Sequence, residues 1–238
     1  MTKDDYDLDN IIKSSFEEII EYFNKNRIKI EGLRLRIVKS LRSFYDICIL
    51  LFVYQGNLGL YFPNKKIFII KKQLEKTINR VLGELSNNNI KDSSVIGIKL
   101  SKNSIISYPF YVDIKNIKNN IMKTVTDTVV AHEIGHDVLR SNDEWKASAF
   151  EYMVYFYKNE FYKYPEVYKI IEENIKKCKA YIEENKKLNI YELGRCYGNI
   201  IIHKNKQLTN INIKDIIEEI KNLSKKDVID TIKNYEIY

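Results

Sequence analysis

The stretch His132–His136 places two imidazoles and one carboxylate in the pattern H-E-x-x-H. Residues four apart on a helix share one face, so the side chains of His132 and His136 can reach a single metal ion. Zinc is suited to two such nitrogen ligands and one carboxylate, with a fourth position left open. Glu133 lies beside this ligand line, where it can take a proton from an attacking water. The pattern therefore predicts a zinc site that can hydrolyse a substrate.

The residues before the motif decide between this site and two ordinary surface histidines. Val125, Val129 and Val130 make the preceding turns apolar, so a helix that buries them also carries the histidines inward. Neutral imidazoles buried side by side need polar partners, and a metal ion supplies one. We therefore expect one Zn²⁺ per chain.

A third ligand should come from the segment that follows the motif. Asn142 or Asp143 can cap a second helix, with Glu144 in its first turn. Ala147 is small and lies one turn further on, so this helix can pack closely against the first. Glu144 could instead be a solvated acid favoured by the helix dipole. Asp143 and Glu151 are rival ligands, because one shares the cap position and the other lies two turns along the same face.

The motif His132–His136, followed by an E-x-x-A-x-x-F pattern that begins at Glu144, resembles the ImmA/IrrE family of zinc metallopeptidases. The resemblance covers roughly residues 92–160. It implies both histidines and Glu144 as metal ligands, with Glu133 as base and acid. It also implies a gluzincin-like fold, a cytoplasmic location and protein substrates, with helix-turn-helix repressors among them.

Two positions depart from the pattern of that family. Position 148 is Ser where such families usually carry Asn or Asp, a polar partner for a ligand. Position 151 is Glu where a small apolar residue is usual, and the gap between His136 and Glu144 is short. These departures keep a second hypothesis open, in which a zincin-fold binding or sensor module has little or no peptidase activity.

A further residue is needed to stabilise the oxyanion of a peptidase. In gluzincins this role often belongs to a distant His or Tyr. His203 follows the apolar run Ile200–Ile202 and is the only histidine outside the motif. We name His203 as the candidate, while a structural role for it and a role for any of the 18 tyrosines remain open.

The order of elements indicates an α+β fold that is mostly helical. We interpret residues 1–238 as a single zincin-like metallopeptidase domain, with a core at about 60–163 and a helical C-terminal extension at 164–238. The apolar spacing predicts helices at 8–24, 33–54, 74–85, 119–140 and 144–163, a long helix after Pro165, and further helices near 189–203, 213–222 and 225–236.

A small antiparallel or mixed sheet is expected before the motif helix. Tyr61-Phe62 and residues 66–70 predict a hairpin around Pro63-Asn64. Val95–Leu100 and Ser104–Ile114 predict two further strands. We expect Ser104–Ile114 to be an edge strand that binds an extended peptide, since Pro109 is tolerated only at an edge.

The N-terminal segment, the apolar runs and the cysteines indicate the cellular location of the protein. The N-terminus lacks the basic and apolar regions of a signal peptide, and the longest apolar run, Ile47–Tyr54, is too short to span a bilayer. The three cysteines, at wide spacings, form no metal or disulfide pattern, which favours a reducing cytoplasm.

The chain has 39 Lys and Arg against 32 Asp and Glu, and several of the basic residues lie between Arg27 and Arg42. We interpret that stretch as a solvated face. No phosphate-binding glycine loop or helix-turn-helix pattern accompanies it, so the expected partner is a protein or peptide substrate rather than nucleic acid.

Overall fold

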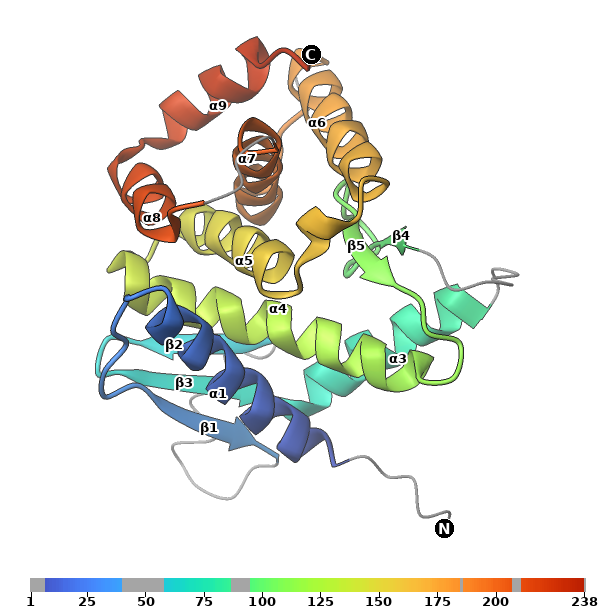
Figure 1. The fold of residues 1–238 in the computed structure, drawn as a ribbon, viewed down its shortest axis with the longest axis vertical. Helices are drawn as coiled ribbons and strands as arrows, with labels where there is room; N and C mark the ends of the chain where they lie inside the picture. Colours follow the sequence, from blue (N-terminus) through green and yellow to red (C-terminus); the bar gives the residue numbers. More distant parts are fainter. Residues whose placement is uncertain (1–6, 40–57, 87–94, 185, 207–210, 238) are drawn as a thin grey trace.

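Helices form most of the chain that the computed structural model describes, which comprises residues 7–39, 58–86, 95–184, 186–206 and 211–237. Five short strands in these ranges form two small sheets, which confirms the predicted α+β class (Figure 1). The helices are α1 (Leu8–Lys25), α3 (Lys71–Ser86), α4 (Ile117–Leu139), α5 (Glu144–Lys158), α6 (Val167–Glu183), α7 (Ile190–Lys204), α8 (Ile213–Asn222) and α9 (Lys225–Asn234), with a 3-10 turn at Phe161–Lys163. The strands are β1 (Arg34–Val38), β2 (Gly59–Phe62), β3 (Lys66–Ile70), β4 (Val95–Ile98) and β5 (Tyr108–Tyr111).

Helix α4 runs through the middle of the molecule between two layers (Figure 1). It contacts α1, α3, β2 and β3 on one side, and α5 and α8 on the other. From Ile121 to His136 every side chain except that of Lys123 is buried. A helix enclosed in this way has no solvated face, which explains why small and β-branched residues fill its middle turns instead of a one-sided apolar stripe.

The larger sheet is mixed and has the order β1-β3-β2. Strand β3 pairs in parallel with β1 and antiparallel with β2. The hairpin predicted around Pro63-Asn64 is confirmed, and Lys65 closes it with a left-handed backbone, φ 64°. Within the described residues β2 is an edge strand of this sheet, and it lies against α4.

The helix predicted at 33–54 is wrong at its start. Arg34–Val38 forms strand β1, in parallel register with Lys66–Ile70. Leu35 and Ile37 alternate with arginines, and this period of two is the strand signal that a helical reading overlooked. The remainder of that prediction, including the apolar run Ile47–Tyr54, lies outside the described residues.

Most other predicted elements are confirmed with shifts at their ends. The strands predicted at 95–100 and 104–114 shorten to β4 and β5, which pair antiparallel. The helix predicted at 144–163 ends as α5 at Lys158, because Glu160 adopts a left-handed backbone with φ 54°. One continuous apolar core runs from Leu8 in α1 to Ile232 in α9. Among the described helices, none has the length and apolar character that a membrane span requires.

The prediction that the cysteines form no disulfide is wrong. The sulfur atoms of Cys178 and Cys196 are 2.12 Å apart and bonded, and they link α6 to α7. The two positions are 18 residues apart on separate helices, so only the packing of those helices brings them together. This bond removes one support for a cytoplasmic location, because disulfides persist mainly in oxidising compartments.

We predict that reduction of this disulfide destabilises the protein. A cross-link that closes a loop of this length restricts the unfolded chain and contributes about 3 kcal/mol to the free energy of unfolding. Urea unfolding with and without reductant measures the difference. The variant Cys178→Ala/Cys196→Ala is the control, and its stability should not depend on reductant. Equal stability of the oxidised and reduced wild type would contradict the prediction.

Candidate metal centre

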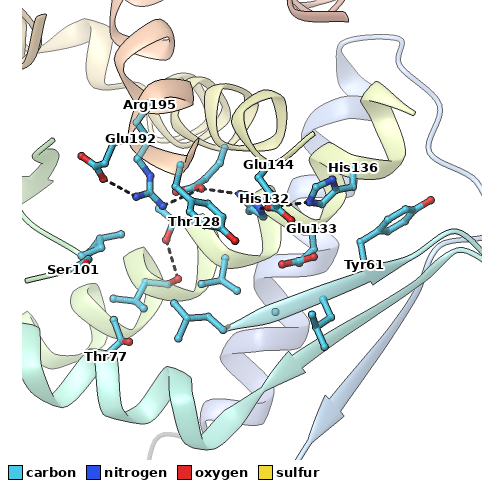
Figure 2. A pocket seen from close by; sticks show the side chains of 18 of the residues that line it. Tyr61, Thr77, Ser101, Thr128, His132, Glu133, His136, Glu144, Glu192 and Arg195 are labelled. Atoms are coloured by element: carbon cyan, nitrogen blue, oxygen red, sulfur yellow. Dashed lines mark hydrogen bonds and ion pairs between the residues drawn. The ribbon is translucent and has the colours of Figure 1, made fainter. Parts of the chain in front are cut away.

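The sequence-predicted ligands lie together at the centre of the molecule. The Nε2 atom of His132 lies 2.9 Å from the Oε2 atom of Glu144, and that of His136 lies 3.5 Å from the same oxygen. Within the described ranges these three residues form a group whose potential ligand atoms all lie within 4.8 Å of one another. Figure 2 shows their side chains converging from α4 and α5.

Both imidazoles are held so that Nε2 faces Glu144. The Nδ1 atom of His136 donates to the carbonyl oxygen of Ser141 at 2.8 Å, and that of His132 donates to the carboxylate of Glu151 at 3.1 Å. The neutral form of each imidazole with its proton on Nδ1 leaves the Nε2 lone pair free to bind a metal ion. A tetrahedral zinc ion about 2.1 Å from each ligand would hold ligand atoms about 3.4 Å apart. The observed distances of 2.9 and 3.5 Å and the N₂O donor set fit that ion.

The electrostatics of the site favour a cation. Burial alone would lower the pKa of His132, but hydrogen bonds with Glu144 and Glu151 outweigh it and raise that pKa to about 10. Burial likewise acts to raise the pKa of Glu144, yet its bonds with both histidines lower it to about 2. The surrounding carboxylates thus stabilise positive charge at the position where the two Nε2 atoms meet.

Close packing of α5 on α4 places Glu144 at the histidines. A Cβ atom on Gly135 would lie 2.9 Å from the Phe150 ring and 3.4 Å from the Cα atom of Ala147. The glycine of the motif and the predicted small residue at 147 therefore allow the two helices to approach. The short connection turns at Arg140, whose φ is 49°, and Glu144 opens α5.

Glu133 lies beside the ligands and against strand β2. A Cβ atom on Gly59 would lie only 2.7 Å from the Oε1 atom of Glu133, so a larger residue in the strand would displace the carboxylate. Burial raises the pKa of the Glu133 carboxyl to about 7, although the charge of His132 opposes this. A carboxyl with a pKa near neutrality can both accept and return a proton.

A cavity of about 470 Å³ opens beside this centre. The metal-binding group and Glu133 line it together with strand β2, the start of α7, the upstream turns of α4 and the loop after β4. Its other lining residues include Leu58, Gly59, Leu60, Tyr61, Thr77, Leu100, Ser101, Ser104, Val125, Thr128, Val129, Tyr191, Glu192 and Arg195. The site can therefore receive an extended ligand next to the histidines.

The two rival ligands lie apart from the group formed by His132, His136 and Glu144. Asp143 caps α5, its side chain is 57% exposed, and it does not line the cavity. Glu151 is buried and lines the cavity, but it contacts the Nδ1 atom of His132, on the side of the ring away from Glu144. Neither residue joins the group that could hold a metal.

His203 is not brought to this site. Its Nδ1 atom pairs with the hydroxyl of Tyr235 at 2.8 Å, its Nε2 atom lies 3.5 Å from Glu172, and it does not line the cavity. The structure therefore does not place His203 where the predicted oxyanion role requires it. Its position in the last turn of α7 directs the ring toward α9 and α6, whereas the start of α7 lines the cavity.

Several lining residues were missed by sequence reasoning. The ring of Tyr191 lies 5.8 Å from that of His132, and the ring of Tyr61 stacks 5.9 Å from that of His136. Arg195 and Glu192 form an ion pair of 3.1 Å one helical turn apart. That turn spacing was visible in the sequence, but nothing linked it to a motif more than fifty residues earlier.

Comparison of the chain with protein-family models, with curated proteins and with solved structures finds no match. The resemblance to ImmA/IrrE peptidases thus rests on the residues of the motif alone.

We predict that the chain binds one zinc ion and that Glu144 is the third ligand. Glu144→Ala should weaken zinc binding by more than the roughly 10- to 100-fold that changes around a metal site cost, because a ligand is lost. Asp143→Ala is the matched control, since this neighbouring acid lies outside the metal-binding group. Metal analysis and competition with a chromophoric chelator measure both. A greater loss in Asp143→Ala would show that the ligand is assigned one residue too late.

Proposed function

We propose that the protein is a zinc-dependent endopeptidase that hydrolyses peptide bonds in a protein substrate. One observation carries this proposal: the buried carboxyl of Glu133 lines the same cavity as a group of two imidazoles and one carboxylate suited to zinc. Zinc bound there would supply a Lewis acid that polarises the scissile carbonyl and lowers the pKa of water toward about 7. A site that held zinc for structure alone would need no such base beside it.

Glu133 is the general base and acid of this proposal. Its carboxylate accepts a proton from the attacking water and then returns it to the amine that leaves. Contact with Gly59 holds the carboxylate near the ligands, and its raised pKa suits both transfers.

Strand β2, and not the predicted segment Ser104–Ile114, is the better candidate to hold an extended peptide. Gly59, Leu60 and Tyr61 line the cavity, whereas only Ser104 of the predicted segment does so. Within the described residues β2 ends the larger sheet, so a substrate could add to it as a further strand. Its main chain would then pass Glu133 and the ligands.

Tyr191 takes the oxyanion role in place of His203. It lines the cavity next to His132. Burial, and then the charges of Glu144 and Glu133, raise the pKa of Tyr191 to about 12, so its hydroxyl stays protonated and able to donate. A donor preorganised toward developing negative charge stabilises the transition state more than the ground state.

The resemblance supports repressors of the helix-turn-helix class as substrates and a cytoplasmic location. The disulfide between Cys178 and Cys196 argues against a cytoplasmic location. Alkylation of free thiols in intact cells tests the location of the protein, since a cytoplasmic protein should carry both cysteines reduced.

We predict that Glu133→Gln abolishes hydrolysis without loss of zinc. The substitution keeps the shape of the side chain and all three ligands but removes the proton acceptor, so cleavage should fall by roughly 10² or more. The assay incubates the zinc-loaded protein with a library of proteome-derived peptides and counts new termini by mass spectrometry. The variant, purified identically, also controls for contaminating proteases. Equal cleavage by both proteins, or none by the wild type, would favour the zincin-fold binding or sensor module.

We also predict that Tyr191→Phe lowers kcat by roughly 100- to 1000-fold, the range for removal of one oxyanion donor, with little change in KM. The ring remains, so packing on His132 is kept. Steady-state kinetics on a peptide from the library measure the two constants, and His203→Gln is the control. A larger effect of His203→Gln would restore the original assignment.

A further inference from the structure

Glu151 contacts a predicted metal ligand from the side opposite the metal. Its Oε2 atom lies 3.1 Å from the Nδ1 atom of His132, while the hydroxyl of Ser148 lies 3.5 Å from the same nitrogen. A distance of 3.5 Å is beyond the usual range for a strong hydrogen bond to nitrogen. The acceptor that fixes the tautomer and the plane of the His132 ring is therefore the carboxylate of Glu151.

This carboxylate is itself held from three elements. Only 3% of Glu151 is exposed, so its charge would be costly to bury without partners. The hydroxyl of Tyr108, from β5, donates to its Oε1 atom, and the guanidinium of Arg195, from α7, lies 3.6 Å from its Oε2 atom. With His132 from α4, these contacts leave the carboxylate little freedom to move.

The arrangement extends from Arg195 to a wall of the cavity. Arg195 also pairs with Glu192 at 3.1 Å. The carboxylate of Glu192 accepts hydrogen bonds from the Ser104 hydroxyl at 2.9 Å and from the Ile106 backbone N–H at 3.2 Å. Arg195 thus connects Glu151, which contacts His132, to Glu192 and the loop that lines the cavity (Figure 2).

Helices α5 and α7 pack closely at Ser148, one turn before Glu151. A Cβ atom on Gly194 would lie 2.8 Å from the Cβ atom of Ser148 and 2.0 Å from the carbonyl oxygen of Trp145. The backbone of α7 at Gly194 therefore packs directly against Ser148 and Trp145, and a side chain at position 194 would push the two helices apart. One turn further along α5, at Glu151, Arg195 is within reach of a carboxylate.

We propose that Glu151 is the positioning residue of the metal site, which orients His132 through Nδ1, while Gly194 lets α7 approach α5 closely enough to bring Arg195 to Glu151. The departures from the family pattern at 148 and 151 are then a single change, in which the supporting polar group lies three residues further along α5. This inference rests on the zinc site of the proposed function.

The test measures zinc affinity in the full chain after removal of metal with a chelator. Glu151→Gln removes the charge at nearly constant shape, and Glu151→Asp keeps the charge beside Arg195 but shortens its reach to His132. Each should weaken zinc binding by roughly 10- to 100-fold, the usual effect of removing a partner of a ligating histidine. Ser148→Ala is the matched control, and it should change the affinity by less than about threefold, because its contact with His132 is long.

Two further readouts separate positioning from folding. Thermal unfolding of the metal-free variants reports their stability. Absorption bands of bound Co²⁺ report the ligand geometry, and they should shift in Glu151→Gln but not in Ser148→Ala. If a Glu151 variant binds zinc within about threefold of wild type and leaves the cobalt bands unchanged, the inference is overturned, even when its melting temperature falls. Wild-type protein that binds no zinc would overturn the proposed function itself, and the inference with it.

Discussion

The burial of charged and polar groups around one helix is the constraint on which this structure depends. His132, Glu133 and His136 lie in α4, which is enclosed by other elements along most of its length. Groups of this kind are stable in an interior only where each has a partner. Glu144 and Glu151 supply partners for the two imidazoles, and the surrounding helices are placed so that both carboxylates reach them. The same packing of helices therefore forms the core and positions the polar groups of the site.

Small residues allow the helices around the site to pack closely. Gly135 lets α5 approach α4, and Gly194 and Gly198 let α7 approach α5, since a Cβ atom at any of them would crowd the neighbouring helix. A glycine inside a helix costs up to about 1 kcal/mol relative to alanine, so each needs a compensating contact. Here the compensation is a close helix approach that brings Glu144 and Arg195 to their partners.

The sheet contributes a wall to the site. Strand β2 passes so near Glu133 that a Cβ atom at position 59 would displace the Glu133 side chain. The same strand fixes the far end of the motif helix, because the hydroxyl of Tyr61 donates to the carboxylate of Asp137 at 3.0 Å. Lys65, at the turn of the hairpin, pairs with the same carboxylate at 3.2 Å. The edge strand is thus held against the helix that carries Glu133 and the two histidines of the motif.

The sequence alone determined what is local. A spacing of four residues on a helix puts His132 and His136 on one face, and the position after a helix cap brings Glu144 to the first turn of α5. The hairpin at Pro63-Asn64 and most helices follow from equally local patterns. Arg34–Val38 was misread because a strand of five residues can match a helical spacing as well as an alternating one.

Only the tertiary structure decided what depends on distant contacts. It excluded His203, brought Tyr191 and Arg195 to the cavity, and bonded Cys178 to Cys196. It also placed Glu151 against Nδ1 of His132, on the side of the ring away from Glu144, because the direction from which a side chain meets an imidazole is set by how whole helices pack. Periodicity along the chain carries no information about that direction.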